Sequence, residues 1–448
     1  MTDPSLRVDV LMDQATRLLD RLCRQPSISA QGVGISEMAE LLAREMHALG
    51  IDATVHSTPG HPVVVGCVPG GGTRTLLFYN HYDVQPADPL DEWVTPPFKP
   101  SIRDGRFYAR GATDNKGNIV SRLMALEALR AAGALPLIVK FLVEGEEETG
   151  SAHLAAWAAA NKALLAADAC VWEDTFRDEP DVATITLGNK GMCYVEIECE
   201  TASVDFHSSY AGIYPNAAWR LLEALATLRG PDGRVAVDGF YRDVRPHTDE
   251  DHALLATLPP IDMAARRRTF GLSHVPHPDG RDARRAHLTE PTSNLAGFEA
   301  GYRGAGSKTV VPRRAAAKVD FRLVPDQDPH EVAANVRRHL DARGFTDIAV
   351  RVLGAEFPFR TDLADPFVEV VRRSVEATTG RSALVYPTSA GTGPMHDMGP
   401  VLHLPMVSVG IGYWNARAHA PDENVRAADY RETVLLMADV LERFAAAG

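Results

Sequence analysis

The sequence of 448 residues has little cysteine, no excess of basic charge and no long apolar run. Its five cysteines are an odd number and form no C-x-x-C pair, which argues against a disulfide framework and favours buried, reduced thiols. Because 46 Lys and Arg stand against 59 Asp and Glu, the net charge is −13. This balance lacks the basic footprint of a protein that binds nucleic acid or an anionic membrane.

The sequence also shows neither the pattern of a signal peptide nor that of a membrane-spanning helix. Residues 1–24 mix charged side chains with Leu and Val at helical spacing and lack the apolar centre of a signal peptide. The apolar stretch 154–160 is too short to cross a bilayer. We therefore expect a cytoplasmic protein with no nucleic-acid partner and no membrane partner.

Strand-like and helix-like segments alternate through the first part of the chain. The runs 63–68, 75–79 and 137–143 predict strands, and 117–132 predicts a helix that ends at a glycine. The almost continuous apolar run 137–143 is typical of a buried parallel strand. This alternation predicts an α/β fold with a mostly parallel sheet flanked by helices.

The pattern changes near residue 190. Segments 193–199 and 316–324 alternate apolar and polar residues, as half-exposed strands of an antiparallel sheet do. Residues 231–300 are rich in Pro, Arg, His and Asp and predict mostly loops and short elements. We predict an α/β domain of residues 1–189 and 358–448, interrupted by an inserted α+β domain of residues 190–357.

Potential metal ligands follow two of the predicted strands. If the strand 75–79 continues, His81 and Asp83 point to the same side, so that His81 could bind a metal while Asp83 accepts its other ring N–H. A single pair of this kind among 16 histidines is weak evidence by itself. Asp114 precedes the helix 117–132 and could be a helix cap or a ligand at the carboxyl edge of the sheet.

A run of acids gives a stronger signal. Residues 144–148 contain four glutamates directly after the buried strand 137–143. Like charges at such a place repel unless a cation neutralises them, and a metal pair would leave one Glu as ligand and its neighbour as general base. Weaker candidates are Glu173 and Asp174, after an apolar stretch, and the loop residue His419. Mixed imidazole and carboxylate ligands suit Zn²⁺, Mn²⁺ or Co²⁺.

Seven segments resemble motifs of the M20 metallopeptidase family, close to its carnosinase-like dipeptidase branch. They are 81–86, 110–117, 144–151, 205–209, 304–312, 321–329 and the loop that contains His419. The segments occur in family order across nearly the whole chain. By this resemblance, residues 190–357 correspond to a lid or dimerisation domain inserted in a catalytic domain, and a homodimer through the lid is implied.

The resemblance implies a centre of two divalent metal ions, with Zn²⁺ the first choice and Mn²⁺ or Co²⁺ as alternatives. The implied metal ligands are His81, Asp114, Glu148, Asp174 and His419. Asp114 would bridge the ions, His81 and Asp174 would hold one of them, and Glu148 and His419 would hold the other. Glu173 remains an alternative to Asp174.

The resemblance also implies catalytic and substrate-binding roles. Glu147 would be the general base, Asp83 would orient His81, and His207 would stabilise the oxyanion, often from a partner subunit. The residues that resemble positions for gripping the substrate carboxylate are Thr309, Arg322 and Thr392. For Arg322, a salt bridge to Asp320 or Asp326 is the alternative interpretation.

The leading hypothesis is hydrolysis of an amide bond in dipeptides or short peptides by a metal-bridged water. One alternative is a deacylase of N-acyl amino acids, of the acylornithine or succinyl-diaminopimelate type. Another is a binding scaffold without enzymatic activity. The sequence departs from the family at Asn115, where Asp is frequent, and at Ser209, where Gly is frequent.

Overall fold

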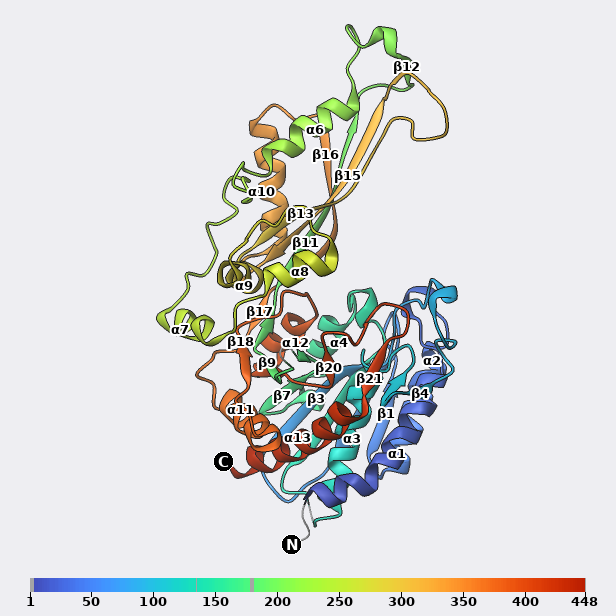
Figure 1. Ribbon diagram of the computed structural model, residues 1–448, viewed down its shortest axis with the longest axis vertical. Helices are drawn as coiled ribbons and strands as arrows, with labels where there is room; N and C mark the ends of the chain where they lie inside the picture. The colour runs from blue at the N-terminus through green and yellow to red at the C-terminus, as the bar shows by residue number, and fades with distance from the viewer. Residues whose placement is uncertain (1–3, 134, 178–180, 448) are drawn as a thin grey trace. The chain divides into compact units, whose positions relative to one another are not determined.

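The computed structural model describes residues 4–133, 135–177 and 181–447 (Figure 1). The chain forms two compact units, which we call the first and the second unit. The first unit consists of Met1–Gly188, Arg360–Pro387 and Pro394–Gly448, and the second of Asn189–Phe359 and Thr388–Gly393. The predicted boundaries after 189 and 357 differ from these by one and two residues.

One segment departs from the predicted division. Residues 388–393, which we had placed with 358–448, belong to the second unit. The backbone N–H of Lys190 donates to the carbonyl oxygens of Ser389 (3.2 Å) and Gly391 (3.0 Å). The side chain of Asn189 also donates to the carbonyl of Gly393. These bonds tie the segment to the start of the second unit, so Thr392 lies in that unit.

An eight-stranded sheet forms the centre of the first unit. Its strands, in spatial order, are β1 (Asp52–His56), β2 (Val63–Val68), β6 (Ile138–Glu144), β3 (Thr75–His81), β7 (Ala169–Trp172), β19 (Met406–Ser408), β9 (Thr184–Thr186) and β18 (Leu384–Tyr386). The pairs β6–β3, β3–β7, β7–β19 and β9–β18 are parallel. The predicted mostly parallel sheet is confirmed, with antiparallel pairs at β1–β2, β2–β6 and β19–β9.

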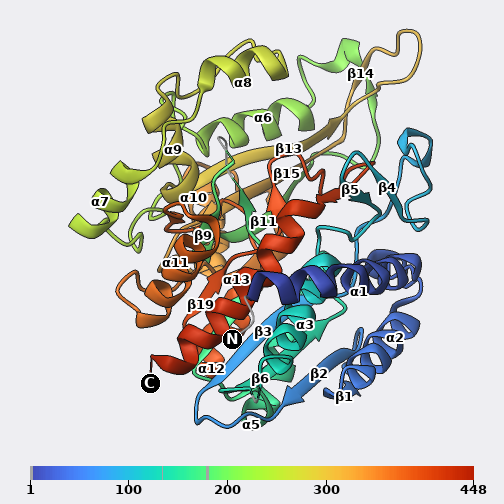
Figure 2. The same ribbon diagram turned by 60° about the horizontal axis from the view of Figure 1, so that its bottom comes forward.

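Helices flank this sheet. Figure 2 shows α1 (Pro4–Arg24), α3 (Lys116–Arg130) and α13 (Ala427–Ala446) together on one side, where α3 packs between the other two. The other helices of the unit are α2 (Ile35–Ala48), α4 (Leu154–Ala160), α5 (Lys162–Leu165), α11 (Pro366–Thr379) and α12 (Met395–Leu402). Because α3 is covered by α1, α13 and the sheet, even its polar residues Asn118 and Arg122 are buried.

The remaining elements of the first unit are short. They are the strands β4 (Ser101–Arg103), β5 (Arg106–Tyr108), β8 (Phe176–Arg177), β20 (Gly412–Tyr413) and β21 (Asn424–Arg426), and the turns η1 (Ser29–Gln31), η2 (Leu90–Glu92) and η3 (Glu147–Thr149). Two further strands, β10 (Gly188–Asn189) and β17 (Phe359–Arg360), lie where the chain passes from one unit to the other. Across the described ranges, no helix combines the length and the apolar composition that crossing a membrane requires.

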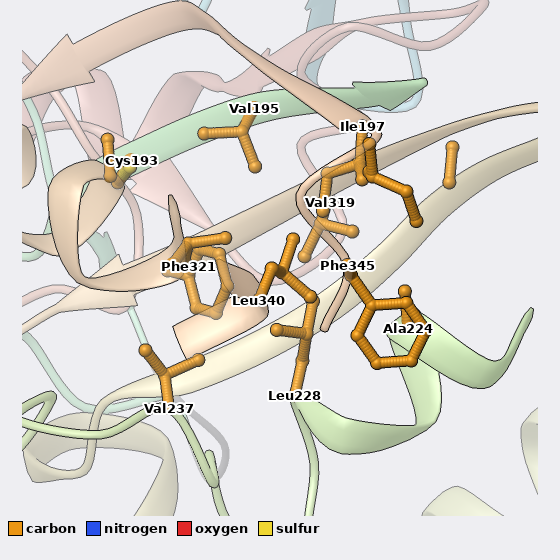
Figure 3. Packing of buried hydrophobic residues seen from close by; sticks show 14 of the residues in the cluster. Cys193, Val195, Ile197, Ala224, Leu228, Val237, Val319, Phe321, Leu340 and Phe345 are labelled. Atoms are coloured by element: carbon orange, nitrogen blue, oxygen red, sulfur yellow. The ribbon is translucent and has the colours of Figure 1, made fainter. Parts of the chain in front are cut away.

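The second unit contains a four-stranded antiparallel sheet. Its strands, in spatial order, are β13 (Thr292–Ala300), β15 (Arg314–Leu323), β11 (Gly191–Glu200) and β16 (Ile348–Glu356). One face of β11 and β15 is buried against α6 (Ala217–Thr227) and α10 (Pro329–Ala342). Figure 3 shows Val195, Phe321 and Leu340 meeting in this core. The antiparallel sheet predicted for the insertion is confirmed.

The outer elements of the second unit depart in part from the prediction. Strands β12 (Phe206–His207) and β14 (Val310–Val311) form a short ladder beside η4 (Ser208–Tyr210). Three short helices, α7 (Asp249–Thr257), α8 (Met263–Phe270) and α9 (Gly280–Thr289), occupy the segment 231–300, where we expected mostly loops and short elements. Each begins at a capping side chain, namely Thr248, Asp262 and Asp279.

Candidate metal centre

The carboxyl ends of three neighbouring strands carry the candidate ligands. In the register of the parallel pair β3–β6, His81 lies opposite Glu144, so the chain that leaves β6 carries Glu147 and Glu148 past His81. Strand β7, on the other side of β3, ends at Trp172 and is followed by Glu173. Parallel strands end at one edge of a sheet, and this edge is the usual ligand site of an α/β fold.

Asp114 lies between two imidazole rings. The Nε2 atom of His81 is 3.0 Å from Oδ1 of Asp114, and the Nε2 atom of His419 is 3.0 Å from Oδ2. His419 also lies 3.1 Å from Oε2 of Glu148. The two carboxylate oxygens of Asp114 thus face different histidines, which is the arrangement that a bridging carboxylate needs. The peptide bond from Asp114 to Asn115 is cis.

Two groups of side chains have donor atoms close enough to share an ion. One consists of His81, Glu147 and Glu173, the other of His81, Asp114 and Glu148, and within each the donor atoms lie within 4.8 Å of one another. Within the described part of the chain, Oε1 of Glu173 is buried and has no hydrogen-bond partner. An orphaned carboxylate oxygen beside imidazole and other carboxylates fits a divalent cation.

The structure distinguishes Glu173 from Asp174. Oδ1 of Asp174 accepts hydrogen bonds from the N–H groups of Thr175 (2.6 Å) and Gly412 (3.2 Å). Within the described residues, Oδ2 of Asp174 is also buried without a partner, but Asp174 is in neither of the two groups that they form, whereas Glu173 is. The geometry therefore favours Glu173, the alternative that the sequence left open, over the predicted ligand Asp174. The reason is local: the first residue after β7 stays beside β3, and the second turns towards Gly412.

Asp83 connects His81 with the Glu147–Glu148 turn. The Nδ1 atom of His81 is 3.0 Å from the backbone oxygen of Asp83 and 3.4 Å from its Oδ1. The carboxylate of Asp83 accepts the N–H groups of Glu147 (3.3 Å) and Glu148 (3.0 Å). Asp83 therefore contacts the ring that we predicted it to orient, and it also fixes the backbone of the acidic turn.

Burial and mutual repulsion perturb the acids of this cluster. Burial, together with the negative charge of Glu173, raises the pKa of Glu147 well above its usual range. Burial also raises the pKa of Glu173 to about 7. Hydrogen bonds with Asp114 and Glu148 raise the pKa of His419 to about 10. The cluster thus retains protons that divalent cations would displace on binding.

Glu423 holds two loops of the cluster together, and our sequence analysis assigned it no role. Its carboxylate accepts hydrogen bonds from Arg110 (2.8 Å) and from the N–H groups of Gly111 (2.9 Å), Thr113 (2.9 Å) and Asp114 (3.0 Å). It lies four residues after His419. The only sequence signal was its place in the acidic loop 421–424, because its partners lie about 310 residues earlier in the chain.

In the second unit, Arg322 and Thr392 lie together. An Nη atom of Arg322 donates to Oγ1 of Thr392 at 2.6 Å, and its Nε is 3.6 Å from Oδ1 of Asp320. Asp326, the other acid considered for Arg322, pairs with Arg245 at 2.6 Å. The structure thus brings together two of the three predicted substrate-binding residues.

His207 and Thr309 lie at the other end of the same unit. His207 pairs with Val310 in the β12–β14 ladder, and the N–H of Ser208 donates to the oxygen of Thr309 at 3.2 Å. This ladder lies beyond the Arg314 end of β15, whereas Arg322 lies at the opposite end. Eight residues of strand span roughly 27 Å, so His207 of one chain is remote from Arg322 of that chain.

Comparison with known proteins gives one family match and many relatives. The model of peptidase family M20/M25/M40 matches residues 77–443. The Cys-Gly metallodipeptidase dug1 of Schizosaccharomyces pombe is 30% identical, over 74% of this chain and 74% of its own. The Beta-Ala-His dipeptidase of Homo sapiens is 29% identical, over 85% of this chain and 77% of its own.

Solved structures resemble the chain over nearly its full length. The M20 family metallo-carboxypeptidase Sso-CP2 from Sulfolobus solfataricus has a TM-score of 0.91 and 39% identity, over 96% of this chain and 99% of its own. Human carnosine dipeptidase 1 has a TM-score of 0.83 and 26% identity, over 99% of this chain and 98% of its own. The likeness therefore extends over both units.

Proposed function

Because this chain belongs to peptidase family M20/M25/M40, we propose that it hydrolyses the amide bond of dipeptides or short peptides at a centre of two divalent metal ions. Membership of the family and the enzyme class, a peptidase hydrolase, agree with the sequence-based prediction. The observation that carries the proposal is the position of Asp114, whose two oxygens face His81 and His419 beside three further carboxylates.

In this proposal His81 and Glu173 would hold one ion, Glu148 and His419 would hold the other, and Asp114 would serve both. When bound, such a pair supplies Lewis acidity that polarises the scissile carbonyl and makes a water molecule acidic. Zn²⁺ is our first choice. Mn²⁺ and Co²⁺ remain alternatives, because imidazole and carboxylate ligands accept all three.

Glu147 is the proposed general base. Its carboxylate lies within reach of His81 and Glu173, and its backbone is held by Asp83. It takes a proton from the attacking water and transfers that proton to the leaving amine. Asp83, which contacts His81 through Nδ1, holds the ring and the acidic turn in place during both steps.

Arg322 and Thr392 are the proposed binding site for the carboxylate at the substrate's C-terminus. A guanidinium binds a carboxylate through two parallel hydrogen bonds, and the hydroxyl of Thr392 already lies beside it. Both residues belong to the second unit although 70 positions separate them in the sequence.

His207 and Thr309 are proposed to act on a substrate held by a second copy of the chain. An extended dipeptide spans only about 7 Å, far less than the roughly 27 Å along β15. His207 of one copy would then stabilise the oxyanion in the other, and a homodimer through the second unit follows. We also retain the predicted cytoplasmic location, which subcellular fractionation would test.

A substrate panel tests the proposed reaction. We expect turnover of dipeptides with a free C-terminal carboxylate, loss of turnover when that carboxylate is amidated, and loss after chelation of the metals. Longer peptides belong in the panel because the structural relative Sso-CP2 is named a metallo-carboxypeptidase. Turnover of N-acyl amino acids without turnover of any peptide would identify a deacylase. A binding scaffold would hydrolyse none of these compounds.

A further inference from the structure

Arg122 is a buried cation next to the segments that carry the proposed metal ligands. None of the roles assigned above involves it. It lies on α3 and is only 1% exposed. Within the described ranges, its four hydrogen bonds go to three carbonyl oxygens and one side-chain amide oxygen. Burying a charged group is costly, so a guanidinium with such partners is expected to have a structural or functional purpose.

The partners of Arg122 stand next to proposed ligands on two parallel strands. One Nη atom donates to the oxygen of Tyr79 (2.6 Å) and to the side chain of Asn80, the two residues before His81. The other Nη atom donates to the oxygen of Trp172 (3.3 Å) and to that of Glu173. One planar side chain thus fixes the ends of β3 and β7 relative to each other.

Asn80 extends this connection to a third ligand. Its Nδ2 atom donates to Oδ1 of Asn115, which follows Asp114 directly. Asn115 is a position where the sequence departs from the family pattern, and here its amide oxygen accepts from the residue that Arg122 holds. A single network therefore joins the backbone segments that carry His81, Asp114 and Glu173.

We propose that Arg122 is a positioning residue that sets the geometry of one metal ion, the ion held by His81 and Glu173. This inference rests on the proposed di-metal function. It is selective because Asp114 is shared by both ions, whereas the two ligands that belong to the other ion alone have different supports. Glu148 is held by the side chains of Gln85 (2.9 Å) and Asp83 (3.0 Å), and the loop of His419 is held by Glu423.

The test compares metal binding by three forms of the metal-free protein: wild type, Arg122→Lys and Arg130→Lys. Lysine keeps the charge but lacks the planar fork that reaches both strands. Arg130 is the control on the same helix: it also donates to two carbonyl oxygens, those of Leu49 and Gly50, but it is 29% exposed and pairs with Glu127. Each protein is titrated with Co²⁺ by calorimetry, and thermal unfolding is measured with and without Co²⁺.

We expect wild type and Arg130→Lys to bind two ions. Arg122→Lys should bind one ion as wild type does and the other about 10- to 100-fold more weakly. Relative to wild type, Arg122→Lys should lose more of the rise in Tm that Co²⁺ causes than it loses in the Tm of the metal-free protein. Unchanged affinity for both ions, or equal weakening of both, would overturn the inference.

A second variant covers the case in which Arg122→Lys does not fold. Asn80→Ala keeps the buried charge but removes one acceptor of Arg122 and the bond to Asn115. It should weaken the ion held by His81 and Glu173 more than the other ion. Wild-type Co²⁺ binding by Asn80→Ala would then overturn the inference. If wild type itself binds fewer than two ions, the proposed di-metal centre fails and the inference fails with it.

Discussion

Glu147 and Glu148 are neighbours in the sequence, but their side chains have different surroundings. Glu148 is only 4% exposed, and its Oε2 already contacts His419 and Gln85. The carboxylate of Glu147 instead lies within 4.8 Å of donor atoms of His81 and Glu173, and burial raises its pKa well above the usual range. A ligand must give up its proton permanently, whereas a general base must exchange it, and these surroundings match the two roles.

We expect Glu147→Gln to lower kcat by about 100- to 10,000-fold, because it removes the proton acceptor while keeping the size of the side chain. Metal content should remain at two ions per chain, as determined by elemental analysis. Glu148→Gln is the matched comparison, since it should lose a metal ion as well as activity. Substantial turnover by metal-loaded Glu147→Gln would show that another group takes the proton.

At the scale of elements, the local pattern predicted the strands that carry the ligands. The predicted strands 75–79 and 137–143 correspond to β3 (Thr75–His81) and β6 (Ile138–Glu144), because nearly continuous apolar runs are typical of buried parallel strands. The predicted helix 117–132 corresponds to α3 (Lys116–Arg130). The sequence predicted mostly loops and short elements over 231–300, because α7 and α8 bury few residues and show no clear apolar stripe. Helix α9 does bury Ala283, Ala286 and Leu288, but most of its other residues are charged or polar.

Contacts between distant segments could not be predicted in the same way. Whether Glu173 or Asp174 faces the cluster depends on where β7 ends and on the turn towards Gly412, which adjacent acids in a sequence do not reveal. The partners of Arg122 lie 42 to 51 residues away, so only the fold brings them together. The resemblance to a family therefore supplied most of the predicted ligands, and local physics supplied their supporting strands.

Glu144, the last residue of β6, should make the stability of the protein depend on pH. Burial raises the pKa of Glu144 to about 8, although Tyr79 and Ser151 donate hydrogen bonds to its carboxylate. The unfolded chain releases this proton near the usual value of 4.5, so between about pH 4.5 and 8 the folded state holds one proton more. The stability contributed by this proton is therefore lost as pH rises, by up to about 1.4 kcal/mol per pH unit.

Glu144→Gln should remove this dependence, because glutamine has no proton to lose. We expect the variant to gain stability relative to wild type as pH rises from 5 to 8. Denaturant unfolding of both metal-free proteins across this range measures the difference. A constant difference between them would mean that Glu144 is ionised in the folded protein.

At the scale of the whole molecule, two of the proposed substrate-binding groups lie at opposite ends of the second unit. His207 lies at the β12–β14 end of the second unit, and Arg322 lies at the opposite end of β15, roughly 27 Å away. Exposed apolar side chains surround the His207 end, namely Val204, Tyr210, Ile213 and Trp219. These observations support a dimer in which every active site contains residues from two chains.

Mixing two inactive variants tests this arrangement. His207→Ala retains Glu147, and Glu147→Gln retains His207, so a mixed dimer contains one site with both residues intact. If subunits exchange at random, half of the dimers are mixed and about one quarter of wild-type activity should return. The comparison is an equal mixture of Glu147→Gln with the double variant His207→Ala/Glu147→Gln, which cannot form a complete site. Recovery in neither mixture, with subunit exchange demonstrated by mass spectrometry, would place His207 in the active site of its own chain. Full activity of His207→Ala by itself would place His207 outside the reaction.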